Sequence, residues 1–87
     1  MANTFQFEII TPDQTFYKGQ VSSLIVPQME GYFGVLANHA PLIARSNGGK
    51  VTIREESQSE KQFKVGPGII EVKKNRAIIL TREAQQA

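Results

Sequence analysis

Apolar and polar residues alternate along most of this chain, and this pattern constrains the fold more than any other feature. At the start, Phe5, Phe7 and Ile9 alternate with Gln6 and Glu8, so an extended segment would present one apolar and one polar face. Such alternation is typical of half-buried strands. Many short strands with turns between them predict a β-sandwich or a barrel, with no long helix.

Turn residues divide the alternating segments. Gly19 is expected to end one short strand and Pro27 the next, and the pair Lys74 and Asn75 predicts a two-residue hairpin turn, because asparagine tolerates positive φ. The expected strands cover residues 5–9, 16–17, 21–26, 32–36, 50–56, 62–65, 69–73 and 76–80. The last few residues are too few for a stable isolated helix. We therefore expect a β-sandwich domain over 1–81 and a frayed tail over 82–87.

The length of 87 residues leaves room for one small domain. Domains of this size bury a limited share of their surface and usually gain stability from disulfides, metals or association. Cysteine is absent, which excludes disulfides and thiolate metal sites. A protein partner is the remaining expected source of stability.

The charge is close to balanced, with ten Lys and Arg against eight Asp and Glu. Only Lys73 and Lys74 are adjacent basic residues, so no block of like charge indicates a nucleic-acid or lipid surface. The N-terminus lacks a signal-peptide pattern, and no stretch approaches the roughly 18 apolar residues that span a bilayer. We expect a soluble chain with no nucleic-acid partner and no direct bilayer insertion.

Catalytic and metal-binding patterns are scarce. His39 and Asp13 are the single histidine and the single aspartate, and no serine lies in a nucleophile-elbow motif that could complete a triad with them. One histidine with scattered glutamates lacks the spacing of a zinc site. Glu55 and Glu56 are adjacent, so on a strand their carboxylates point to opposite faces and cannot flank one substrate bond. The glycines form no phosphate-binding motif. These patterns indicate neither an enzyme nor a cofactor or metal site.

Two features leave alternatives open. Aromatic residues such as Phe5, Phe7 and Phe63 could stack on single-stranded nucleic acid in a small β-barrel, although their alternating positions favour a core. Residues 30–44, EGYFGVLANHAPLIA, predict a short strand and a turn in which His39 bonds neighbouring backbone groups. The alternative is a functional loop held by a rigid scaffold.

Residues 30–42 resemble the stretch Glu-Gly-x-x-Gly-x-Leu-x-x-His-Ala-Pro-Leu of the epsilon-subunit family of the rotary ATP synthase. The matching residues are Glu30, Gly31, Gly34, Leu36, His39, Ala40, Pro41 and Leu42. Flanking features follow in the same order, among them the run GPGIIEV at 66–72. The resemblance thus covers about the whole chain.

The resemblance implies an all-β fold, a ten-stranded β-sandwich of two sheets without the C-terminal helical hairpin of longer members. It also implies a non-catalytic rotor subunit without a cofactor, which couples gamma-subunit rotation to the membrane c ring in proton-driven ATP synthesis. Such a subunit is peripheral, on the cytoplasmic side of a bacterial inner membrane or the stromal side of a thylakoid membrane.

The resemblance further implies two contact surfaces. The c-ring-facing residues are Gln28, Met29, Glu30, Gly31 and Tyr32, and the gamma-facing residues are Thr11, His39 and Ala44. Together, the alternation and the resemblance predict a core between the sheets. Its expected members are Phe7, Ile9, Leu24, Val26, Val35, Ile53, Phe63, Val65, Val72 and Leu80.

Overall fold

In the computed structural model, which describes residues 3–29 and 31–87, all regular structure is β-strand. The strands are β1 (Phe5–Thr11), β2 (Gln14–Gln28), β3 (Gly31–Leu36), β4 (Leu42–Ser46), β5 (Gly49–Glu55), β6 (Glu60–Val65), β7 (Gly68–Val72), β8 (Arg76–Thr81) and β9 (Ala84–Gln86). These residues include no helix that is long and apolar enough to cross a membrane.

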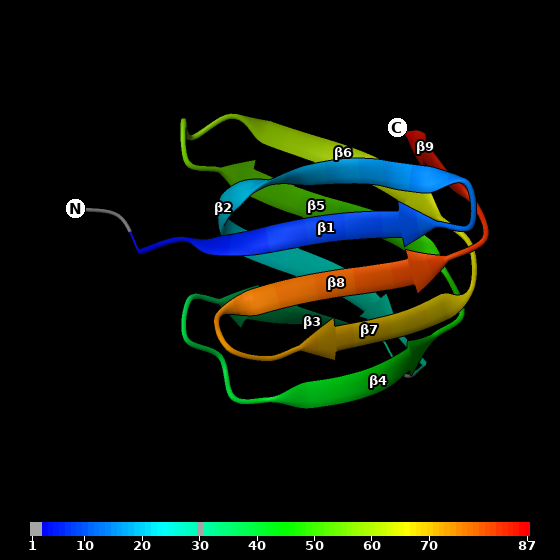
Figure 1. Ribbon diagram of the computed structural model, residues 1–87, viewed down its shortest axis with the longest axis horizontal. Coiled ribbons are helices and arrows are strands. Elements are labelled where there is room, and N and C mark those ends of the chain that lie inside the picture. Colours follow the sequence, from blue (N-terminus) through cyan, green and yellow to red (C-terminus); the bar gives the residue numbers. More distant parts are fainter. Residues whose placement is uncertain (1–2, 30) are drawn as a thin grey trace.

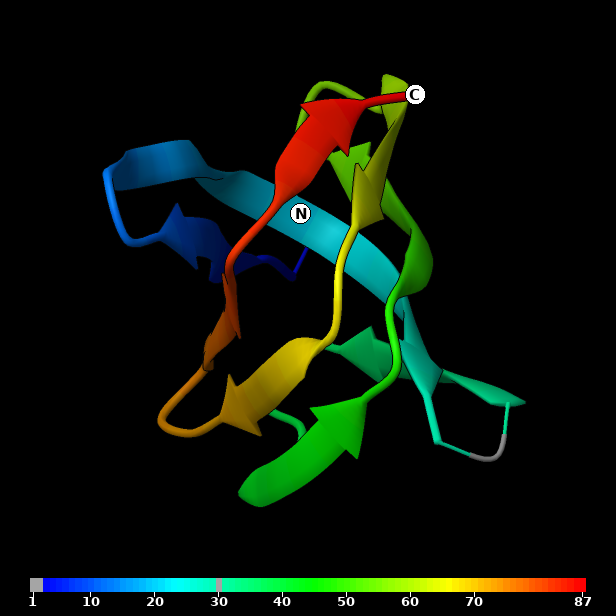
Figure 2. The same cartoon turned by 90° about the vertical axis from the view of Figure 1, so that its right-hand side faces the viewer.

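The strands form two layers that share β2. Their hydrogen-bonded order is β4-β7-β8-β1-β2-β5-β6-β9, and β3 pairs with β2. The first half of β2 pairs with β1, and its second half lies between β3 and β5. The front layer consists of β4, β7, β8, β1 and the first half of β2, and the back layer of the second half of β2 with β3, β5, β6 and β9 (Figure 1). Figure 2 shows the two layers facing each other from the side.

The all-β sandwich is confirmed. The described residues contain no helix, and they form nine strands rather than ten. The expected break at Gly19 is wrong, because β2 continues through it for fifteen residues. A side chain there would meet Tyr17, since a Cβ on Gly19 would lie 2.7 Å from Tyr17 Oη. The register shift of β2 against β5 between Val21 and Ser23 indicates a bulge, which lets a strand bend from one layer to the other.

The chain end differs from the expected frayed tail over 82–87. β9 pairs antiparallel with β6, with Ala84 opposite Val65, and the Ala87 amide donates a hydrogen bond to the Gln62 carbonyl at 3.0 Å. The open edge of β6 supplies backbone partners that a helix-propensity argument does not consider. The sandwich therefore extends beyond its expected end at residue 81.

The core between the layers contains nine of the ten predicted residues. Leu80 is the exception, because it is 45 % exposed while Ile79 is 2 % exposed. Pairing with β1 places Ile79 opposite the buried Ile9, so Leu80 points to solvent. The buried hydrophobic residues that the prediction missed are Phe5, Val21, Val51, Ile70, Ala77 and Ile79.

An aromatic and polar cluster closes the core beside β6. The Tyr17 ring lies 5.9 Å from the Phe7 ring and 5.0 Å from the Phe63 ring, measured between centroids. Tyr17 Oη donates a hydrogen bond to Glu55 Oε2 at 2.6 Å, and Lys61 Nζ lies 3.3 Å from the same oxygen.

Burial, and then the carboxylate partner, raise the pKa of Tyr17 above its ordinary value. The hydrogen bond from Tyr17 holds the pKa of Glu55 below its ordinary value. Glu55 is therefore an internal partner of this cluster rather than simply a solvated strand end.

Candidate functional site

The described residues contain no group of three or more His, Cys, Asp or Glu side chains that could hold a metal ion. His39 Nδ1 lies 2.6 Å from the carbonyl oxygen of Ala40, which accepts a hydrogen bond when Nδ1 carries a proton. The side chain of His39 thus engages the neighbouring backbone, as the turn interpretation predicted.

The β2–β3 hairpin end holds four of the five residues expected to face the c ring, and Glu30 lies outside the described residues. Gln28 and Gly31 form the last pair of this hairpin. Gly31 has a φ of 130°, a backbone conformation that favours glycine. Met29 and Tyr32 are 52 % and 61 % exposed, so the hairpin end presents two large apolar side chains to solvent.

Tyr32 lies beside Pro27 and the start of β5. It pairs with Pro27 across β2 and β3. A Cβ on Gly49 would lie 3.3 Å from both Pro27 Cβ and Tyr32 Oη, so the phenol extends past Pro27 to the start of β5. The hairpin end therefore presents the exposed Tyr32 ring beside Pro27.

The three residues expected to face the gamma subunit do not form one cluster. Thr11 ends β1. His39 follows Asn38, whose amide donates a hydrogen bond to Asn75 Oδ1 at 2.7 Å, while Asn75 Nδ2 donates to the Thr4 carbonyl at 2.9 Å. The His39 loop therefore lies at the start of β1. A seven-residue strand separates its ends by about 20 Å at roughly 3.3 Å per residue, so Thr11 and His39 occupy opposite ends of the front layer.

Ala44 lies on the edge strand β4, between these two positions. It pairs with the buried Ile70, so its methyl group is on the inner, half-buried side of the strand. Its neighbours Ile43 and Arg45 occupy the outer side, and Ile43 is 72 % exposed. Ile43 and Arg45 are therefore the β4 side chains most available to a partner on the outer face.

Three shallow hollows near β4 and the adjoining strand ends share lining residues, and we call them together the β4 groove. The first, of about 360 Å³, brings Gln28 and Met29 beside Ala44. The second, of about 450 Å³, shares Met29 and Arg45 with the first. The third, of about 380 Å³, includes Thr11. The groove thus joins residues assigned from the sequence to two separate partners.

Arg82 and Ile69 line the second and third hollows, and the sequence reasoning singled out neither as a site residue. The fixed spacing of Ile43 and Arg45 along one strand face could have indicated an exposed apolar and basic edge. No local signal indicates Arg82, because it reaches the groove only through the pairing of β8 with β7.

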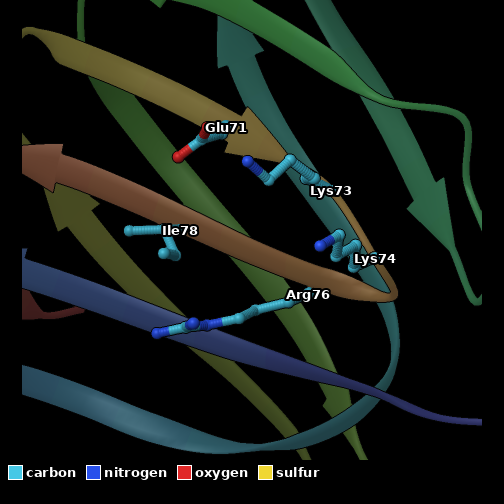
Figure 3. A pocket seen from close by; sticks show the side chains of 5 residues that line it. All are labelled: Glu71, Lys73, Lys74, Arg76 and Ile78. Atoms are coloured by element: carbon cyan, nitrogen blue, oxygen red, sulfur yellow. The ribbon is translucent and has the colours of Figure 1, made fainter.

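A separate pocket of about 240 Å³ lies at the β7–β8 turn, lined by Glu71, Lys73, Lys74, Arg76 and Ile78. Figure 3 shows that these side chains come from the two strands and from the turn between them. The Arg76 guanidinium donates to Glu8 Oε2 from Nε at 3.0 Å and from Nη2 at 2.8 Å. One of the three cations of this pocket therefore has a carboxylate partner within the chain.

Comparison with known proteins identifies relatives of the whole domain. The family model described as "ATP synthase, Delta/Epsilon chain, beta-sandwich domain" matches residues 4–87. The ATP synthase epsilon chain of Chlorobaculum tepidum is 42 % identical over 79 residues, which cover 91 % of this chain and 90 % of that protein. The ATP synthase epsilon chain of Leptospira interrogans serogroup Icterohaemorrhagiae serovar copenhageni is 45 % identical over 80 residues, which cover 92 % of this chain but only 62 % of the relative.

Two solved structures share the fold. A chain in the structure of the Euglena gracilis mitochondrial ATP synthase, OSCP/F1/c-ring in rotational state 1, matches with a TM-score of 0.90 and 20 % identity. The match covers 99 % of this chain and 55 % of that chain. A chain of the Tetrahymena thermophila mitochondrial ATP synthase central stalk/c-ring matches with a TM-score of 0.76 and 15 % identity, over 98 % of this chain and 69 % of that one. At these identities the likeness concerns the fold alone.

Proposed function

This chain belongs to the family of β-sandwich domains of ATP synthase delta and epsilon chains, and from that membership we propose that it is a central-stalk rotor subunit. It joins the gamma subunit to the c-subunit ring and turns with both during proton-driven ATP synthesis. The observation that carries the proposal is the match to an ATP synthase epsilon chain over about nine tenths of both proteins. In this function the chain is not catalytic and holds no cofactor.

The fold suits a joint that transmits torque. Contact surfaces on strands and tight hairpins change shape less than surfaces on long loops. The two layers are held by a closed core with fifteen buried hydrophobic residues among those described. Placed against a c ring, the domain would be peripheral to the membrane, on the cytoplasmic side of a bacterial inner membrane or the stromal side of a thylakoid membrane.

For the two contact surfaces we propose the β2–β3 hairpin end and the β4 side of the front layer. The exposed Met29 and Tyr32, with Glu30 between them in sequence, would face the c ring. The gamma subunit would lie along the front layer, since Thr11 and His39 lie at the two ends of this layer and Ala44 lies on its edge strand β4. Ile43 and Arg45 then add to the contact expected at Ala44.

Reconstitution with the cognate gamma subunit and c ring tests the function and the hairpin contact. We expect the parent chain to co-purify with both partners, and its failure to do so would reject the rotor function. We expect Glu30→Lys to weaken assembly or proton-driven synthesis without changing the isolated fold, because a charge change at a contact surface affects recognition more than stability. Glu56→Lys, at an exposed position of the β5–β6 turn, makes the same charge change as a control. Equal activity of the two variants would remove Glu30 from the contact.

A further inference from the structure

β4 has an open edge. Among the described residues, β4 pairs only with β7. Its backbone forms no further hydrogen bond with the backbone of another described residue. Alternate residues of an edge strand direct their N–H and C=O groups away from the sheet, where an added strand can pair with them. The backbone of β4 is therefore available to an extended peptide.

The first hollow of the β4 groove lies along β4. Its lining combines Gln28 and Met29 with the β4 residues Leu42, Ile43, Ala44 and Arg45. β3 and β9 also have only one neighbour each in the sheet, but none of the β4 groove hollows includes a residue of either strand. A groove beside an open edge can hold the side chains of an added strand, and such pockets give strand addition its specificity.

The charge of the groove selects among possible occupants. Arg45 lines the first and second hollows, Arg82 lines the second and third, and no carboxylate lines any of them among the described residues. Neither Arg45 nor Arg82 takes part in an ion pair among the described residues. A second copy of this chain would bring the same arginines and a net charge of +2 to the interface. Charge complementarity therefore favours an acidic segment over self-association.

We propose that the β4 groove binds an extended acidic peptide segment of a partner protein, which adds as a strand to the free edge of β4. An apolar side chain of the segment packs against Met29 and Leu42, and a carboxylate pairs with Arg45. The inference goes beyond the proposed function, because it depends only on the open edge and the charged groove of the isolated chain. In the proposed rotor assembly, the acidic segment would belong to the subunit that lies along β4.

A titration of the isotopically labelled full chain tests this inference by NMR. The probe is the capped peptide Asp-Val-Thr-Val-Glu-Val-Asp, and its matched control carries lysine at each acidic position. We expect saturable shifts of the amides of residues 42–46 and Met29 with the acidic peptide, and slower hydrogen exchange at the outer β4 amides. The absence of saturation at millimolar peptide, or shifts centred on β3 or β9, would overturn the inference.

Two arginine variants separate groove recognition from general charge. Arg45→Glu should weaken binding of the acidic peptide by about tenfold or more, since it replaces an attractive pair by a repulsive one. Arg54→Glu makes the same charge change in the back layer, at an exposed surface pair with Glu60, and should retain the parent affinity. Equal weakening by both variants would show only non-specific charge attraction and overturn the inference. Concentration-dependent shifts of β4 amides without peptide would assign the edge to a second copy instead.

Discussion

The polar groups around Tyr17 and those around β4 have opposite environments. Tyr17, Glu55 and Lys61 are partners of one another beside the aromatic core. At β4, Ile43 is largely exposed, and Arg45 has no ion pair with any described carboxylate. Polar groups that bond to one another within the chain are less available to a partner, whereas exposed apolar groups and unpaired charges can contact another molecule. We therefore expect the Tyr17 side to contribute more to stability, and the β4 side is the surface that we propose for recognition.

The largest expected difference is between core and edge truncations. Phe63→Ala should lower the free energy of unfolding by about 3–5 kcal/mol, because Phe63 is 3 % exposed and packs on Tyr17 and Phe16. Ile43→Ala, on the exposed edge, should change it by less than about 0.5 kcal/mol. Chemical denaturation followed by circular dichroism measures both. Similar losses of unfolding free energy for the two variants would show that the Tyr17 side does not contribute more to stability than the β4 edge.

A pair of glycine variants sharpens the comparison at the base of the groove. Gly68 lines the β4 groove, and a Cβ at this position would clash with the carbonyl oxygen of Leu80. Gly68→Ala should therefore cost about 1–3 kcal/mol, as overpacking does elsewhere. Gly34→Ala is the control, because its Cβ would meet only the Leu24 carbonyl oxygen, at 3.8 Å. If thermal denaturation shows equal stability for Gly68→Ala and Gly34→Ala, the close contact between β7 and β8 does not limit this position.

A smaller effect, of about 1 kcal/mol, is expected from Tyr17→Phe at neutral pH, where a part-buried hydrogen bond is lost. Tyr32→Phe is the matched control, since its hydroxyl makes no hydrogen bond to any described residue.

The effect of Tyr17→Phe on the free energy of unfolding should depend on pH. Tyr17 lowers the pKa of Glu55 in the folded state below 4.5, so the stability linked to this carboxylate is present above pH 4.5 and is lost as the pH falls through the lowered value. The difference in unfolding free energy between the parent and Tyr17→Phe should shrink on acidification below pH 4.5. A difference that stays constant with pH would show that the phenol stabilises the fold without acting on Glu55.

Local patterns were sufficient for much of the fold. The turn at Lys74 and Asn75 is confirmed, with φ values of 53° and 58°, because the side chain and backbone requirements of a two-residue hairpin are local. Alternation also identified most of the core. It failed at the run Ile78, Ile79 and Leu80, where consecutive apolar residues carry no information about which one faces inward. Only pairing with β1 decides that.

The sequence by itself determined the strand-rich class, the principal core positions and a family resemblance, because these depend on residue type and short-range spacing. Tertiary structure alone decided that the chain end pairs with β6. It also decided that Met29, Arg45 and Arg82 border one groove. These residues are far apart along the chain and meet only through strand pairing and the two-layer arrangement. Surface grooves of this kind arise from long-range contacts, which a local pattern does not encode.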